Sequence, residues 1–231
     1  MKCKSRKLNS ALTFIAIEDS VEGRGTQLTW VQLIGILLCA FSWHLAAAQT
    51  ASPAAAQSSI DADQLAKANA GDAAAQVEVG EHYAKAAATE HNRDRSAGEY
   101  QLAADWYRKA AGQKSIDAEL HLAALYRDGG SGFPRDMAQA AAWYTKAAEQ
   151  GDVGAQGTLG VLYSMGQGVP RDDVEAYFWF DLAASVKGPN QEKYAANRQM
   201  IGERITADEL ADVEDRVAAW KAAHPRPETT R

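Results

Sequence analysis

Residues 155–184 of this chain read AQGTLGVLYSMGQGVPRDDVEAYFWFDLAA, and this stretch decides the fold. Small or apolar residues recur at helical spacing in its first half: Ala155, Leu159, Gly160, Leu162 and Tyr163. This spacing predicts an amphipathic helix. A loop rich in glycine follows, and Asp172 with Glu175 three residues later predicts a capping box that opens a second helix. The stretch therefore predicts a helical hairpin.

The same pattern occurs three times in the chain. Trp106, Trp143 and Trp179 are 37 and 36 residues apart, and each is followed directly by a second aromatic residue and then by an alanine pair. A tyrosine also stands eight residues after an alanine in each copy, at Tyr83, Tyr126 and Tyr163. One helical hairpin cannot bury its own apolar face, so repeated hairpins stack side by side into an α-solenoid. We expect the tryptophans to be core residues of this stack.

The shared pattern A…LG..Y..G.GV..D…A..W[YF]..AA resembles the Sel-one-like repeat, which is related to the tetratricopeptide repeat. This resemblance implies an all-α, right-handed solenoid that binds other proteins and catalyses no reaction. It predicts repeats at about residues 72–112, 116–150 and 153–187. The first repeat departs from the pattern because Trp106 follows Tyr83 by 23 residues, against 17 and 16 in the other two. We expect these extra residues, around 88–93, to form a longer polar loop in place of the glycine loop.

Capping segments are expected at both ends, since a solenoid must shield its terminal apolar faces. Residues 60–70 predict a single helix before the first repeat. Residues 190–224 predict a C-terminal cap of two helices, the second opened by a capping box at Thr206 and Glu209. Its apolar stripe is expected to cover the third repeat: Leu210, Val213, Val217 and Trp220. The solenoid with its caps then spans 60–224, and 225–231 is expected to be a disordered tail.

The N-terminal segment has the pattern of an export signal. Residues 30–45 are mostly apolar and are followed by Ala46-Ala47-Ala48, which predicts a signal peptide within 1–48 and cleavage after it. Residues 49–59 read as a flexible linker. The protein is then periplasmic or secreted, and the alternative is an adaptor held in the inner membrane by an uncleaved signal. The acidic residues before the apolar run suggest that the true start codon lies downstream.

Composition excludes several other functions. The formal net charge is −6 and no basic stripe is present, which argues against binding to nucleic acid. Cys3 and Cys39 both lie in the signal region, so the exported part has no disulfide and no thiolate metal site. The histidines are scattered, and no catalytic motif, metal site or cofactor site is predicted. Some cysteine-rich secreted relatives of the repeat family are associated with β-lactam hydrolysis, and this activity is the alternative function.

A partner surface follows from helical phase. If the small and apolar positions of each first helix face the core, the opposite face is free to bind an extended protein segment. In related solenoids the first helices line the concave surface, so the resemblance places the partner there. The predicted partner-binding residues are Glu78, Glu81, Lys85, His121, Asp128, Thr158 and Met165, with Ala124 and Val161 between them. The expected partner is a protein or peptide.

Overall fold

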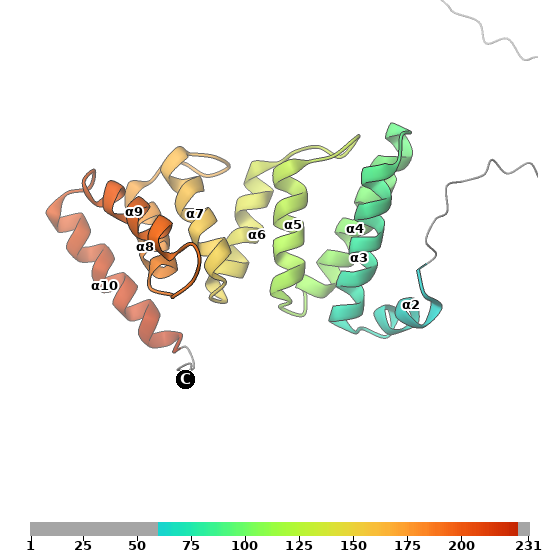
Figure 1. Cartoon of the computed structure of the whole chain (residues 1–231), viewed down its shortest axis with the longest axis horizontal. Helices are drawn as coiled ribbons and strands as arrows, with labels where there is room; N and C mark the ends of the chain where they lie inside the picture. Colours follow the sequence, from blue (N-terminus) through green and yellow to red (C-terminus); the bar gives the residue numbers. More distant parts are fainter. Residues whose placement is uncertain (1–59, 226–231) are drawn as a thin grey trace, which may run out of the picture. The chain divides into compact units, whose positions relative to one another are not determined.

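The computed structural model describes residues 60–225, which form an all-helical array (Figure 1). The predicted signal peptide, linker and tail lie outside these residues, apart from Pro225. The helices of the described part are α2 (Ala62–Asn69), α3 (Ala73–Thr89), α4 (Arg93–Ala111), α5 (Ile116–Asp128), α6 (Met137–Glu149), α7 (Val153–Met165), α8 (Asp173–Ala184), α9 (Gln191–Gly202) and α10 (Ala207–Ala223).

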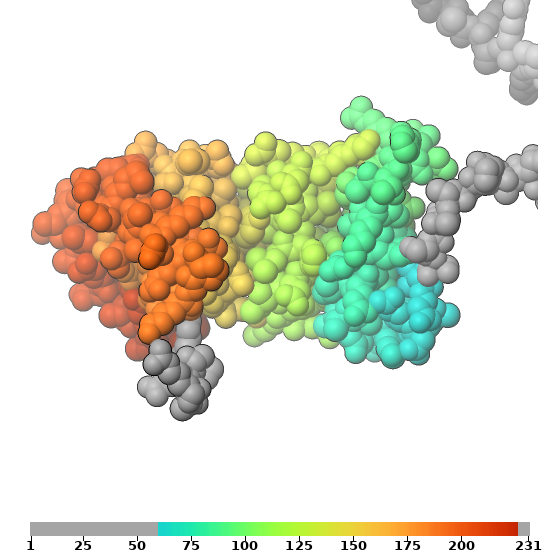
Figure 2. Space-filling model, viewed as in Figure 1, coloured from blue at the N-terminus to red at the C-terminus, as the bar shows by residue number. Residues whose placement is uncertain are grey.

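Three antiparallel hairpins make up most of the array: α3 with α4, α5 with α6, and α7 with α8. The hairpins stack in chain order, so that α4 packs on α5 and α6 packs on α7 (Figures 1 and 2). We call α3, α5 and α7 the first helices and α4, α6 and α8 the second helices. The all-α solenoid predicted from the repeats is confirmed. Within residues 60–225 the only β-type pairing is an isolated bridge between Gly130 and Phe133.

Side-chain caps fix where the helices begin. Each first helix follows a residue whose side-chain oxygen accepts a backbone N–H of the first turn: Asp72, Ser115 and Asp152. These bonds satisfy donors that have no partner inside the helix. The predicted capping box of α8 is only half formed, because Asp172 accepts from the Glu175 N–H at 3.0 Å without a return bond. The box at Thr206 and Glu209 is complete.

Within two of the hairpins, a glycine of the first helix receives an aromatic ring of the second. A Cβ atom on Gly80 would lie 2.5 Å from the ring of Tyr107, and one on Gly160 would lie 2.6 Å from the ring of Phe180. Both rings are buried. The missing Cβ therefore lets the ring lie on the helix backbone, which explains why glycine precedes the tyrosine of the first helix by three positions.

The tryptophans are not equally buried, which corrects the prediction that all three are core residues. Trp106 and Trp143 are half-buried, and the Nζ atoms of Lys109 and Lys146 lie 3.7 Å from their ring centres. Trp179 is buried, because α10 packs against α8 and position 182 holds a leucine where the other repeats have lysine. The aromatic residue after each tryptophan is the one buried in all three repeats: Tyr107, Tyr144 and Phe180.

The first hairpin also differs from the prediction. Its extra residues lengthen both helices, to 17 residues in α3 and 19 in α4, against 13 in α5 and 13 in α6. The connection is short and holds only residues 90–92, so the longer polar loop predicted there was wrong. In the other repeats a glycine loop packs on the preceding second helix, as Gly168 does on the Met137 carbonyl. The helix before the first repeat, α2, has only 8 residues, against 19 in α4 and 13 in α6.

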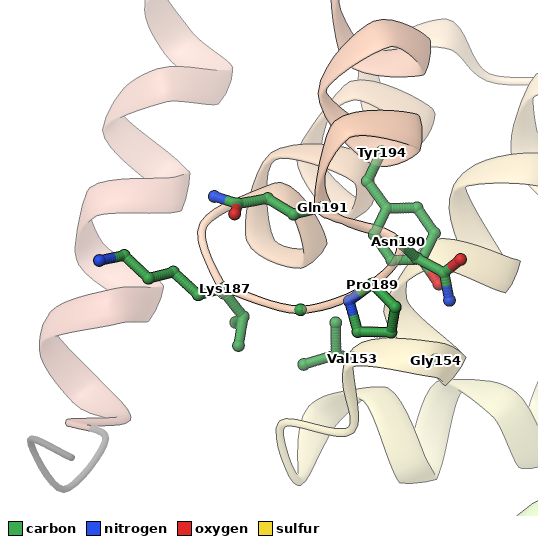
Figure 3. Close-up of a pocket in the computed structure, with 9 residues that line it drawn as sticks. Val153, Gly154, Lys187, Pro189, Asn190, Gln191 and Tyr194 are labelled. Carbon is green, nitrogen blue, oxygen red and sulfur yellow. The ribbon is translucent and has the colours of Figure 1, made fainter. Parts of the chain in front are cut away.

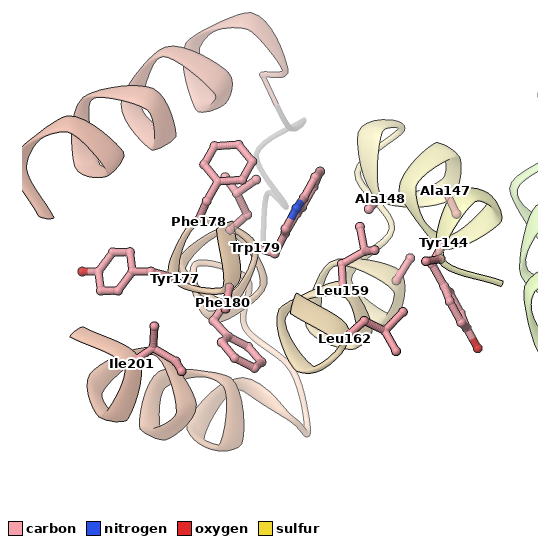
Figure 4. Close-up of a cluster of buried hydrophobic side chains, with 14 of the residues drawn as sticks. Tyr144, Ala147, Ala148, Leu159, Leu162, Tyr177, Phe178, Trp179, Phe180 and Ile201 are labelled. Carbon is pink, nitrogen blue, oxygen red and sulfur yellow. The ribbon is translucent and has the colours of Figure 1, made fainter. Parts of the chain in front are cut away.

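The C-terminal cap surrounds α8 with two helices. Buried apolar side chains lie on every side of α8. Tyr177, Phe178, Trp179 and Phe180 point from it in different directions (Figure 4). Helix α9 packs on one side, and α10 buries Val213 and Val217 on another. Asp181 joins all three helices through Arg198 at 2.6 Å and Lys221 at 2.7 Å. Burial alone would raise the pKa of Asp181, but its hydrogen bonds with Lys221 and Arg198 outweigh burial and lower it.

A ladder of buried side-chain amides runs along the turns between repeats. Gln76 donates to the Ala68 carbonyl at 3.0 Å, and Gln156 donates to the Ala148 carbonyl at 3.1 Å. Each carbonyl belongs to the last residue but one of the preceding helix. Glu119 holds the same position in the second repeat, is buried, and accepts from Gln150 at 2.7 Å. A carboxylate cannot donate to a carbonyl, so this ladder position lacks the bond that its two counterparts make. Burial raises the pKa of Glu119.

Replacing Glu119 with Gln is expected to raise the free energy of unfolding at pH 7 by about 1 kcal/mol. The new amide can donate to the Ala111 carbonyl and keeps the bond from Gln150. Because the folded pKa of Glu119 lies above its unfolded value, its contribution to stability falls as pH rises through that window. The gain from Glu119→Gln should therefore shrink in acid, where Glu119 is protonated. Urea unfolding at several pH values measures this, with the exposed Glu203→Gln as control; an equal gain for both variants would contradict it.

Substituting tryptophan by alanine should cost more stability at the buried Trp179 than at a half-buried tryptophan. Trp179→Ala is expected to cost about 3–5 kcal/mol because it empties a buried site. Trp143→Ala should cost roughly 1–2 kcal/mol, since its ring is half in water and loses mainly the lysine contact. Thermal or urea unfolding of the two variants provides the comparison. Equal losses would show that the third repeat is not more tightly enclosed than the second.

Candidate functional site

The predicted partner-binding residues all lie on the first helices. Glu78, Glu81 and Lys85 belong to α3, His121 and Asp128 to α5, and Thr158 and Met165 to α7. Each of them is exposed or half-buried, as are Ala124 and Val161. We call these nine residues the first-helix face. The structure therefore leaves the whole predicted set accessible.

His121 connects the first two repeats on the part of the face formed by α3 and α5, which we call the front. Its ring stacks on Tyr107 with centroids 4.8 Å apart, and its Nε2 lies 3.2 Å from Glu81 Oε1. The contact brings α3, α4 and α5 together at one point. Burial, followed by the nearby Glu81 carboxylate, raises the pKa of the Tyr107 hydroxyl, which stays neutral. This cluster holds the front of the face in a fixed shape.

Most charges at the front of the face are already paired. Glu81 accepts from Lys85 at 3.1 Å, and Asp128 accepts from the Arg127 Nε at 2.7 Å. Glu78 accepts from the amide of Gln64 in α2. The hydrogen bond with Arg127 lowers the pKa of Asp128 despite partial burial. The front is therefore polar, with Glu81 and Asp128 paired with cations and Glu78 bonded to a neutral amide.

The part of the face on α7, which we call the rear, is apolar. Thr158 turns its hydroxyl back to the Gly154 carbonyl at 2.8 Å, which leaves its methyl group outward. Met165 is 63% exposed at the end of α7, and Val161 is half-buried between the two. The residue types alone indicate this change from polar to apolar along the face. They do not indicate which charges pair, because each pairing depends on side-chain geometry.

A small pocket lies where α7 and α9 begin (Figure 3). It has a volume of about 250 Å³, and its walls include Val153, Val186, Pro189 and Tyr194. The Lys187 side chain extends away from the other lining residues. The pocket is open to solvent, and the titratable residues of its lining are Lys187 and Tyr194. Sequence reasoning did not find it because it is formed by a turn and two helix starts.

Val186 in this pocket marks the end of the amide ladder. Gln113 and Gln150 donate to Gln76 and Glu119, and Val186 holds the corresponding position of the third repeat. The Oε1 atom of Gln156 is accordingly buried without a hydrogen-bond partner. An unpaired buried oxygen costs free energy. The third repeat therefore gives up one hydrogen bond at the wall of the pocket.

The described residues show no arrangement suited to metal chemistry or membrane insertion. In the part from 60 to 225, no three His, Cys, Asp or Glu side chains converge to hold a metal ion. Over the same residues, no helix combines the length and apolar character that crossing a bilayer requires.

Three successive segments match the Sel1 repeat model, at residues 73–115, 116–152 and 155–185. The chain belongs to the Sel1 repeat family. The Sel1 repeat protein of Oxalobacter formigenes is 31% identical, with 57% of this chain and 92% of that protein covered and a TM-score of 0.46. A protective antigen of uropathogenic Escherichia coli with an SLR fold is 25% identical, at a TM-score of 0.47. The match covers 73% of this chain and 44% of the antigen. No curated protein matches the sequence.

Restoring the ladder tests how the third Sel1 repeat differs from the others. Val186→Gln should supply a donor to the Gln156 Oε1 and raise the free energy of unfolding by about 1 kcal/mol. Val186→Met lengthens the side chain without adding a donor and serves as control. Urea unfolding of the two variants measures the difference. If the methionine variant gains as much, filling of the pocket and not the hydrogen bond explains the effect.

Proposed function

We propose that this protein is a non-catalytic scaffold of the cell envelope that binds a segment of another protein on its first-helix face. Sel1 repeat proteins generally mediate protein–protein interactions. The observation that carries the proposal is the accessibility of all nine residues of that face on a rigid helical support. An extended or helical segment can lie across α3, α5 and α7 and contact side chains from each repeat in turn.

The envelope location is supported by the sequence of the N-terminal segment. The apolar run at 30–45 and the Ala46-Ala47-Ala48 site are typical of an exported protein. Loss of this segment would leave a mature chain without cysteine, which suits a scaffold that needs no disulfide. The proposed product is a periplasmic or secreted adaptor, tethered to the membrane only where the segment is retained.

The face is short, so the expected partnership is modest in size. Three repeats offer few contacts compared with longer solenoids, and the area available is that of a transient or co-assembled complex. Recognition would then depend on a small number of well-placed residues. The histidine cluster at the front can position the partner by hydrogen bonds, while the apolar rear can supply most of the binding free energy.

Charge reversal on the face is expected to abolish partner capture. The variant Glu78→Lys, Glu81→Lys and Asp128→Lys breaks the paired front and repels the segment that fits it, so recovery of partner from an envelope fraction should fall at least tenfold. The control reverses three exposed acids elsewhere, Glu149, Glu203 and Asp212, and changes the net charge equally. Quantitative mass spectrometry of the captured proteins compares the two. Equal losses would point to a non-specific charge effect and would contradict the proposed face.

A further inference from the structure

The rear of the first-helix face continues onto α9. Three large apolar side chains are exposed among residues 60–225: Leu102 at 43%, Met165 at 63% and Met200 at 56%. Leu102 lies on the second helix α4, but Met165 ends the first helix α7 and Met200 lies on α9. An exposed methionine costs solvation free energy and is often found at surfaces that bind varied partners. Two exposed methionines on neighbouring helices therefore indicate a candidate binding surface.

Helix geometry places Met165 and Met200 on the same side of the array. The ring of Tyr194 in α9 lies on Gly157 of α7, so these residues mark the line where the two helices touch. At about 100° per residue, Val161 and Met165 lie about 40° and 80° to one side of that line on α7. Met200 lies about 120° from Tyr194 in the opposite sense on α9. Because α8 reverses the chain between them, α7 and α9 run in the same direction, and these opposite rotations open toward one side.

The heights of the two methionines also agree. Met165 is eight residues beyond Gly157, a rise of about 12 Å, and Met200 is six residues beyond Tyr194, a rise of about 9 Å. The difference of about 3 Å is less than the length of one side chain. Val161, Met165 and Met200 therefore form one apolar surface, which we call the methionine patch.

One charge faces the same side as the patch. Lys193 lies about 100° from Tyr194 in the same sense as Met200. It is exposed and makes no ion pair with any of the described residues. The α7 residues on this side, Thr158, Val161 and Met165, carry no charge. The patch therefore combines apolar surface with one cation, Lys193, that pairs with none of the described residues. The segment that complements it is apolar and carries one acidic residue.

We propose that the methionine patch binds an amphipathic helix of a partner protein whose apolar stripe has an acidic residue beside it, matched to Lys193. This inference rests on the proposed function and names the partner class for the rear of the same surface. Neighbouring helix axes lie about 8–10 Å apart, which matches apolar anchors spaced by one or two helical turns. The flexible methionine side chains adapt to anchors of different shape. The front of the face then sets orientation, and the patch sets affinity.

The test selects ligands without knowledge of the natural partner. Random 16-residue peptides displayed on phage are panned on the full chain, and enriched sequences are synthesised. They should carry apolar residues three or four apart with a nearby Asp or Glu. Met165→Asp with Met200→Asp should weaken their binding at least tenfold, and Lys193→Glu should weaken it several-fold. Leu102→Asp, an equally drastic change at an exposed apolar residue on another surface, should leave binding unchanged. Unaltered melting curves confirm that the variants are folded.

Methionine methyl signals locate the bound peptide directly. The chain has four methionines, Met1, Met137, Met165 and Met200, so a sample with ¹³C-labelled methionine methyl groups gives few signals. Titration should shift those of Met165 and Met200 and leave that of Met137, which lies beneath the Gly168 loop. Peptides that bind the double aspartate variant with unchanged affinity but lose affinity for the charge-reversed front would overturn the patch and leave the proposed function standing. A library that yields no binder at all would overturn both.

Discussion

An aromatic ring lying on the bare backbone of the neighbouring helix is the contact on which the first and third repeats depend. Tyr107 on Gly80 and Phe180 on Gly160 fill the same place in different repeats, and each ring would overlap a Cβ atom if one were present. In the second repeat Ala123 takes the glycine position beside Tyr144, and both are buried. Because close packing is very sensitive to one methyl group, this contact sets how near the two helices of a hairpin can approach. The stacking of hairpins follows from that spacing.

The polar groups around this contact change together between the second and third repeats. Arg127 donates to the Tyr144 hydroxyl at 2.9 Å in the second repeat. In the third repeat the arginine position is Ser164 and the tyrosine position is Phe180, so no hydroxyl loses its partner. The amide ladder does not follow this rule, since Val186 removes the donor while Gln156 keeps the acceptor. Buried polar groups are thus matched in one network and left unmatched in the other.

The third repeat differs most because it carries the end of the array. Second helices of the earlier repeats expose Asp105 and Ala142 just before the tryptophan, whereas α8 has the buried Phe178. This extra apolar surface is covered by α10, and Arg216 lies 4.9 Å from the Phe178 ring centre at its edge. The array therefore ends on a second helix with an added apolar face and a helix that covers it. The first-helix face lies on α3, α5 and α7 and stays accessible.

The sequence by itself determined the helical hairpins, their number and the residues on the first-helix face, because these depend on periodicity within one helix. It also indicated the cap helices at both ends of the array, α2, α9 and α10. The capping box of α10 can be read from the sequence because its residues are only three positions apart. Tertiary structure alone decided which tryptophan is buried, because that depends on α10 lying against α8, far along the chain. It also decided that the extra residues of the first repeat lengthen α3 and α4, and that Glu81 contacts both Lys85 and His121. Each of these outcomes rests on contacts between separate helices, and local spacing holds no information about the distance between side chains on different helices.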